Sequence, residues 1–141
     1  MAHFARLDAN NVVTYVTTCD NSFLLVDGKE VRDNKAAMDH LDKSVLPEIL
    51  NTGVKWIQTS YNANFRERMA SPGVIFSESG DLFYPPQRYN SWTLDSNYVW
   101  NSPIPVPDDA GFLADGRLKT YDWDEDAYQA DNSKGWVERI I

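Results

Sequence analysis

The residues that could carry out nucleophilic or metal chemistry are few and widely separated. The chain has two histidines, His3 and His40, and one cysteine, Cys19. Zinc sites use close ligand pairs such as Cys-x-x-Cys or His-x-x-x-His, and the sequence contains neither. A Cys–His nucleophilic pair remains open, but no flanking pattern supports one. We therefore expect no catalytic and no metal-binding residues, and we expect Cys19 to be a small buried side chain at a strand end.

Acidic clusters suggest two further kinds of chemistry, calcium binding and glycoside hydrolysis. The Asp8–Asn10 and Asp124–Asp126 segments resemble the start of a calcium-binding EF-hand loop, but both lack the later glycine and glutamate that complete the cage. The Asp108–Asp109 pair or the Asp122–Asp126 segment could supply the paired carboxylates of a glycosidase. Turn capping by aspartate explains all four without a ligand. The sequence has no phosphate-binding loop, dinucleotide fingerprint or nucleophile elbow, so we expect no cofactor and no enzymatic activity.

Aromatic residues near the C-terminus are the most informative feature. Four of the five tryptophans follow Gln87. In a segment too small for a conventional core, large rings bury the most area per residue. Trp and Tyr also dominate the hot spots of protein interfaces. Both interpretations can hold for different rings, and the candidate partner-binding residues are Trp92, Trp100, Trp123, Trp136, Tyr98 and Tyr121.

Composition limits the class of protein and of partner. The chain has 141 residues, 43% of them hydrophobic and 13% aromatic, which is enough for a packed core. The net charge of -8 disfavours binding to nucleic acid or to an anionic membrane, and it suits docking onto a basic protein surface. A lone cysteine excludes an intramolecular disulfide. We see no secretory signal and no apolar stretch near the roughly 18 residues of a membrane span, so we expect synthesis in a reducing cytoplasm.

The elements that position these residues are mostly β-hairpins. Residues 4–18, 73–84, 92–100 and 121–138 alternate apolar and polar positions around turn residues. Phe23–Val26 is a further possible strand. A four-residue motif occurs three times: a large apolar residue, Asp, any residue, and then Asn or Asp. We attribute it to one shared turn type. The three segments are Leu7–Asn10, Leu94–Asn97 and Trp123–Asp126.

One helix is predicted over residues 34–51. Asn34 is its expected N-cap, Pro47 should kink it or divide it at Leu46, and Gly53 would fit a C-terminal cap. The predicted fold is α+β, mostly β, with antiparallel hairpins, one kinked helix and an aromatic-rich C-terminal hairpin tail. The composition changes at Gln87, and alternate prolines at 103–107 predict an extended connector. We therefore predict an N-terminal α+β domain over residues 1–86 and a β-hairpin tail over residues 87–141.

Several segments spread over most of the chain together form a distinctive pattern. They are Met1–Asp8, Val54–Asn62 (VKWIQTSYN), Asn64–Arg66, Pro86–Asp95 (PQRYNSWTLD), Trp100, Pro103, Pro107–Asp109 and Tyr121–Glu125 (YDWDE). This pattern resembles a family of small virion-associated structural proteins of tailed marine phages of the cyanophage type. Two places depart from the family: residues 70–84 lack its Tyr- and Gly-rich strand, and the final hairpin is longer, with Trp123 and Trp136 thirteen positions apart. These departures would change the surface and could adapt it to another partner.

The resemblance implies a virion protein and leaves its position on the particle open. The favoured hypothesis is a capsid decoration or knob-type protein, present in many copies or as a homo-oligomer, that binds other virion proteins, above all the major capsid protein. A second hypothesis is a tail or tail-fibre module that contacts fibre proteins or host glycans. A third is a small phage protein that acts on the host and is never packaged. Neither nucleic acid nor a membrane is an expected partner.

Overall fold

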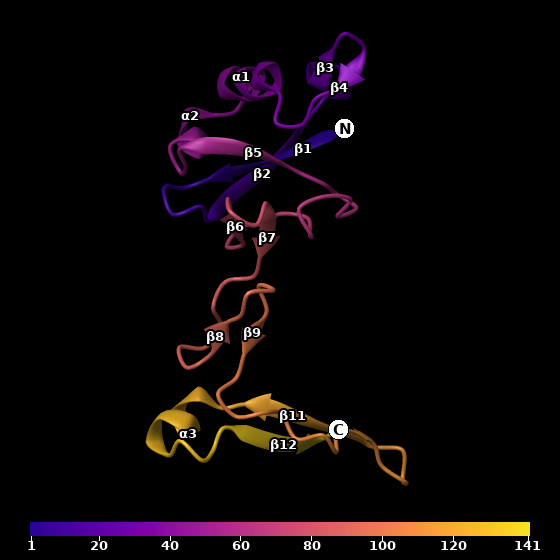
Figure 1. The fold of residues 1–141 in the computed structure, drawn as a ribbon, viewed down its shortest axis with the longest axis vertical. Coiled ribbons are helices and arrows are strands. Elements are labelled where there is room, and N and C mark those ends of the chain that lie inside the picture. The colour runs from indigo at the N-terminus through magenta and orange to yellow at the C-terminus, as the bar shows by residue number, and fades with distance from the viewer. The chain divides into compact units, whose positions relative to one another are not determined.

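The computed structural model describes residues 1–141, which form two compact units, residues 1–86 and residues 87–141. Both units consist mainly of small antiparallel sheets with a few short helices, so the predicted α+β, mostly β fold class is confirmed (Figure 1). The division falls at Gln87, where the composition changes. None of the helices has both the length and the apolar character needed to cross a membrane.

The N-terminal unit is built on a three-stranded antiparallel sheet with the order β2-β1-β5. The predicted first hairpin is present, and the carboxylate of Asp8 closes its turn by accepting the backbone N–H groups of Asn10 and Val12. A third strand, over residues 55–59, pairs with the other side of β1. The strands are β1 (Ala2–Leu7), β2 (Val13–Cys19) and β5 (Lys55–Thr59).

The predicted helix forms as two short helices, α1 (Lys35–Ser44) and α2 (Pro47–Leu50). Asn34 is the N-cap, as expected, because its side chain accepts the Ala36 N–H at 2.8 Å. The predicted C-terminal cap at Gly53 is wrong. Gly53 lies three residues past the end of α2, and a Cβ atom there would be 2.6 Å from the Leu7 carbonyl oxygen, so glycine permits close approach to β1.

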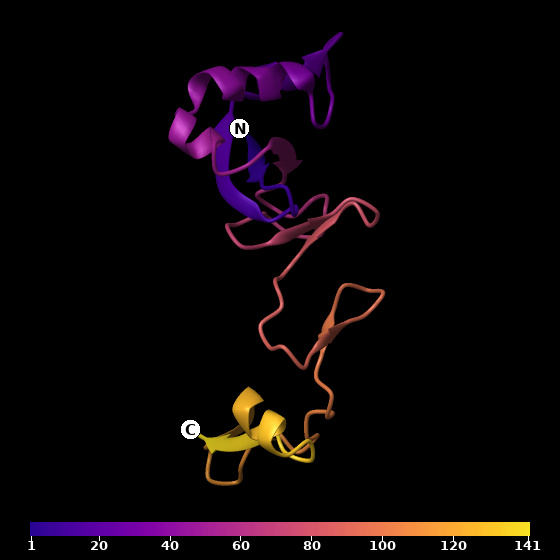
Figure 2. The ribbon, with the colours of Figure 1, turned by 90° about the vertical axis from the view of Figure 1, so that its left-hand side faces the viewer.

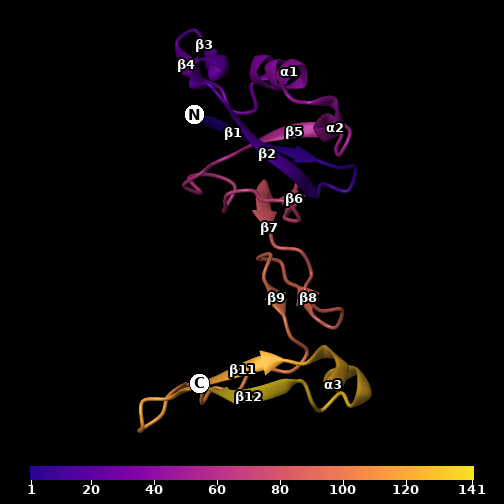
Figure 3. The same ribbon diagram turned by 180° about the vertical axis from the view of Figure 1, so that it is seen from behind.

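Apolar residues cover both faces of this sheet. On one face Phe4 and Trp56 pack with Ala37 and Leu41 of α1, and Figure 2 shows the two helices along that side. On the other face Leu7 and Val13 pack with a hairpin whose strands are β6 (Ile75–Ser77) and β7 (Leu82–Tyr84). Figure 3 shows the helices and this hairpin on opposite sides of the sheet. Alternation along β1 produces both cores, because successive side chains point to opposite faces.

The Phe23–Val26 strand prediction is largely wrong. Asp20 caps a short 3-10 helix, η1 (Asn21–Leu24), by accepting the Ser22 N–H, so that Phe23 and Leu24 are helical. The extended segment that follows is a two-residue strand, β3 (Leu25–Val26), paired with β4 (Lys29–Glu30).

The C-terminal unit contains one short hairpin and one three-stranded sheet of order β10-β11-β12. The strand β10 was not predicted. The turn expected within the 121–138 hairpin instead contains a helix, α3, for which Asp124 accepts the Ala127 N–H as the N-cap. The elements are β8 (Thr93–Leu94), β9 (Trp100–Asn101), β10 (Gly111–Phe112), β11 (Leu118–Trp123), α3 (Glu125–Ala130) and β12 (Trp136–Ile140).

Candidate functional site

Three of the four candidate tryptophans come together at one end of the C-terminal sheet. Trp123 and Trp136 face each other across β11 and β12, with ring centroids 5.1 Å apart in an edge-on arrangement. Trp92 lies 5.9 Å from Trp123 and 6.0 Å from Trp136. Tyr89 contacts Trp92, and Tyr128 of α3 contacts Trp123. We call these five residues the ring cluster. Trp123 is 8% exposed, so it belongs to the core of this unit.

A polar contact attaches the Trp92 segment to α3. The backbone N–H and hydroxyl of Ser91 donate to Glu125 at 3.1 and 2.5 Å. Partial burial opposes ionisation of Glu125, but the Ser91 bonds outweigh it and the pKa of this carboxyl is lowered. Glu125 is therefore a charged anchor for the segment that carries Trp92.

A hollow of about 470 Å³ lies beside the ring cluster. At its rim, the Arg88 guanidinium sits 5.3 Å from the centre of the Tyr89 ring, and Arg139 pairs with Asp122 at 2.9 Å. The indole N–H groups of Trp92 and Trp123 are buried without a hydrogen-bond acceptor, although that of Trp123 lies close enough to Glu125 to favour its ionised form. The hollow thus combines ring faces with hydrogen-bond donors and one carboxylate, and its lining is Arg88, Tyr89, Trp92, Tyr121, Asp122, Trp123, Trp136 and Arg139.

The proline-containing connector lies along one face of the C-terminal sheet. The Trp136 indole donates to the Ile104 carbonyl at 2.8 Å. Tyr121 and Lys119 donate to the two carboxylate oxygens of Asp109 at 2.5 and 2.6 Å. The Lys119 and Tyr121 bonds lower the pKa of Asp109, and the Asp109 carboxylate raises the pKa of Tyr121. Candidate residues Trp136 and Tyr121 therefore hold the connector in place.

The remaining candidates, Tyr98 and Trp100, belong to the β8–β9 hairpin and not to the ring cluster. Trp100 pairs with Leu94, and Tyr98 has a positive φ of 61° in the turn. The carboxylate of Asp95 accepts the N–H groups two and four residues on, as Asp8 does. The predicted common turn is thus confirmed at these two aspartates and wrong at Asp124, which caps a helix.

The residues considered for nucleophilic or metal chemistry lie apart. His40 stacks on Phe23 at 4.0 Å, and His3 lies 5.6 Å from Tyr61. Cys19 is buried at the end of β2, where desolvation raises the pKa of its thiol and makes it a weaker nucleophile. No group of three or more His, Cys, Asp or Glu side chains is placed to hold a metal ion.

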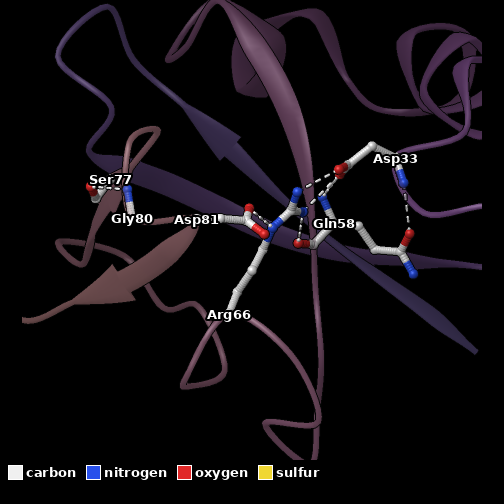
Figure 4. Close-up of polar contacts among 6 residues, drawn as sticks. All are labelled: Asp33, Gln58, Arg66, Ser77, Gly80 and Asp81. Atoms are coloured by element: carbon white, nitrogen blue, oxygen red, sulfur yellow. Dashed lines mark hydrogen bonds and ion pairs between the residues drawn. The ribbon is translucent and has the colours of Figure 1, made fainter.

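Sequence reasoning missed the main charged centre of the N-terminal unit. The Arg66 side chain is 7% exposed and binds Asp33 through two nitrogens, at 2.9 and 2.5 Å, and Asp81 at 2.8 Å (Figure 4). It also donates to the Gln58 carbonyl at 2.8 Å. Burial opposes the charge, but these carboxylates raise the pKa of Arg66. All of these contacts are internal, so the centre fixes the 60–72 loop to β5 and offers no ligand site.

The fold and the ring cluster define a two-unit, mostly β protein with an aromatic hollow in its C-terminal unit. No protein-family profile, curated protein or solved structure matches this chain. The resemblance to the phage family consequently stands on the residues quoted above, and the C-terminal unit is the candidate for partner binding.

Proposed function

We propose that this chain is a bacteriophage virion structural protein of the capsid-decoration or knob type. It binds other virion proteins, first among them the major capsid protein, and it acts without catalysis or a cofactor. The observation that carries the proposal is the C-terminal unit, in which rings gather around a hollow beside two arginines. Rings and arginine are the side chains that supply most of the binding energy at protein interfaces.

Charge supports a protein partner with a basic surface. The C-terminal unit has five basic and ten acidic side chains, a net charge of -5, and the N-terminal unit has eight and eleven, a net charge of -3. A negative surface of this kind accelerates encounter with a basic patch, and the desolvated rings then determine how long the complex lasts.

Multiple copies explain how a small unit could remain bound. Each copy can bury only a modest area, but neighbouring copies on a repeated lattice raise the effective concentration at every site. Many copies per particle, each held weakly, are therefore the expected arrangement for a decoration protein of this size.

The test is to fractionate particles purified from infected cells into heads and tails and to quantify the chain in each fraction by mass spectrometry. Co-purification with heads is the expected result. Complete absence from particles contradicts the virion proposal and favours the non-packaged, host-directed protein. Presence in tails alone contradicts the capsid version and favours the tail-fibre version.

The lining of the hollow supports the tail-fibre version in one respect, because it suits the binding of sugars. Sugars bind with a C–H face on an aromatic ring and with hydroxyls bonded to charged side chains, and the hollow has rings, Arg88 and the Asp122–Arg139 pair. Quenching of tryptophan fluorescence by host glycans would favour this version. Trp92→Ala should abolish the quenching, and Trp100→Ala, outside the hollow, is the control.

A further inference from the structure

The two faces of the C-terminal sheet differ in what covers them. Side chains alternate along each strand, so Lys119, Tyr121 and Trp136 share the face along which the connector lies. The opposite face, which we call the outer face, is mostly exposed, and its Asp122 and Arg139 also line the hollow beside the ring cluster. Its residues are Phe112, Leu118, Thr120, Asp122, Val137, Arg139 and Ile141.

An apolar row crosses all three strands of the outer face. Phe112 lies opposite Leu118, and Leu118 exchanges two backbone hydrogen bonds with Ile141, of 2.9 and 2.8 Å. Residues that are paired directly across an antiparallel sheet place their side chains on the same face. Phe112 is 82% exposed, Ile141 70% and Val137 48%. Apolar side chains that are exposed together in one patch, unlike single ones, mark an interaction surface.

Carboxylates lie at the other end of the outer face. A hollow of about 360 Å³ there is lined by Asp122, Trp123, Val137 and Arg139 of the sheet and by residues 124–126, which are the N-cap and first turn of α3. Its lining has four carboxylates and a single guanidinium, which is already paired with Asp122. The outer face therefore presents an apolar row beside a negatively charged hollow.

A second copy of the chain is a poor occupant for this face. Two copies would repel each other, because the C-terminal unit has a net charge of -5. Face-to-face pairing would also bring the carboxylates of one copy toward those of the other. A basic partner removes that repulsion and adds ion pairs to the apolar contact.

We propose that the outer face is a second docking surface, whose partner is a protein surface with an apolar strip beside lysine or arginine. This inference rests on the proposed function in one respect, that the particle to which the chain attaches is a phage virion. Its residues Phe112, Val137 and Ile141 lie outside the ring cluster, so the two surfaces can be tested separately.

The test replaces the chain in infected cells with the double variant Phe112→Ser, Ile141→Ser and counts copies per purified particle by quantitative mass spectrometry. Both side chains are largely exposed, so the ring cluster should retain its wild-type fluorescence. We expect at least about a tenfold loss of copies, the effect of removing one or two hot-spot side chains. Val54→Ser, at an apolar residue of the N-terminal unit that is 64% exposed, is the matched control and should retain the wild-type number.

Two further variants keep the inference testable. Val137→Thr preserves the β-branched shape and should reduce the copy number if the double variant proves unstable. Asp126→Asn should weaken attachment less at high salt than at low salt, because high salt already screens the attraction between the Asp126 carboxylate and the partner. Wild-type copy numbers in the double variant and in Val137→Thr would overturn the inference. A wild-type dimer in sedimentation that Phe112→Ser abolishes would also overturn it, by assigning the face to a second copy. Absence of the wild-type chain from particles would contradict the proposed function instead.

Discussion

The Trp123 ring lies directly against the backbone of Gly135. A Cβ atom at residue 135 would be 2.4 Å from two carbon atoms of that ring, although Gly135 has an ordinary backbone conformation. The backbone N–H of Asp124 also donates to the Gly135 carbonyl at 2.7 Å, which fixes the approach of the two strands. Glycine at residue 135 therefore makes room for the most buried ring of the cluster.

Gly135→Ala should destabilise the C-terminal unit by about 1–3 kcal/mol, because overpacking forces the ring or the strand to move. The measurement is chemical denaturation followed by tryptophan fluorescence. The nearby exposed substitution Asn132→Ala is the control and should change the free energy of unfolding by less than about 0.5 kcal/mol. Equal stability of Gly135→Ala and wild type would contradict the tight Trp123–Gly135 contact.

Arg66→Ala should destabilise the N-terminal unit by about 2–3 kcal/mol, since it leaves Asp33 without its charged partner. Arg66→Lys should recover only part of the loss, because an ammonium group cannot bind both oxygens of Asp33 and the Asp81 carboxylate in the same way. Arg68→Ala, an exposed arginine two residues away, is the control. An Arg66→Ala protein as stable as Arg68→Ala would show that the centre in Figure 4 contributes nothing.

The contribution of the Asp109–Tyr121 contact to stability should be lost at both low and high pH. The lowered pKa of Asp109 means that its contribution to stability is present above its ordinary value of about 3.9 and is lost as pH falls through the lowered pKa. The raised pKa of Tyr121 means that its contribution is present below its ordinary value of about 10 and is lost as pH rises through the raised pKa. Asp109→Asn should flatten the acid limb and Tyr121→Phe the alkaline limb in pH-dependent denaturation. Asp108→Asn serves as the control, and unchanged limbs would contradict the assignment.

Limited proteolysis should cut first between Pro103 and Arg117, where the only paired strand is the two-residue β10. Trp136→Phe should raise the cleavage rate about fivefold, since it removes the indole bond to the Ile104 carbonyl, worth about 1 kcal/mol. Trp92→Phe makes the same change of ring but removes an N–H that has no acceptor, so it should have a smaller effect. Equal rates in the two variants, or first cleavage within β5, would contradict this account of the connector.

Local sequence signals predicted the hairpins and the capped helix because the physical causes are themselves local. Asp8 and Asp95 close turns through bonds to neighbouring backbone groups, and Asn34 caps the helix that follows it. The helix α3 was missed because its sequence is short and acidic, and its stability comes from the Asp124 cap and from packing on the ring cluster.

Features that depend on distant residues could not be predicted. The Arg66 centre joins residues 33, 58, 66 and 81, and no spacing in the sequence indicates that they meet. The role of Gly53 depends on its approach to β1, and the exposure of Phe112 depends on a strand pairing that two residues alone do not indicate. The sequence did identify Trp92, Trp123 and Trp136 as candidates, but only the register of β11 and β12 brings them together.

The proposed function makes this chain a multi-copy component of a phage head. Its most direct test is the copy number of the chain per purified, DNA-filled particle, measured by mass spectrometry against the major capsid protein as internal standard. We predict a number set by the lattice, with one or a few chains at each capsomer, that falls when Phe112 and Ile141 are replaced. A particle that carries none of the chain, or only the handful of copies typical of a tail component, would contradict it.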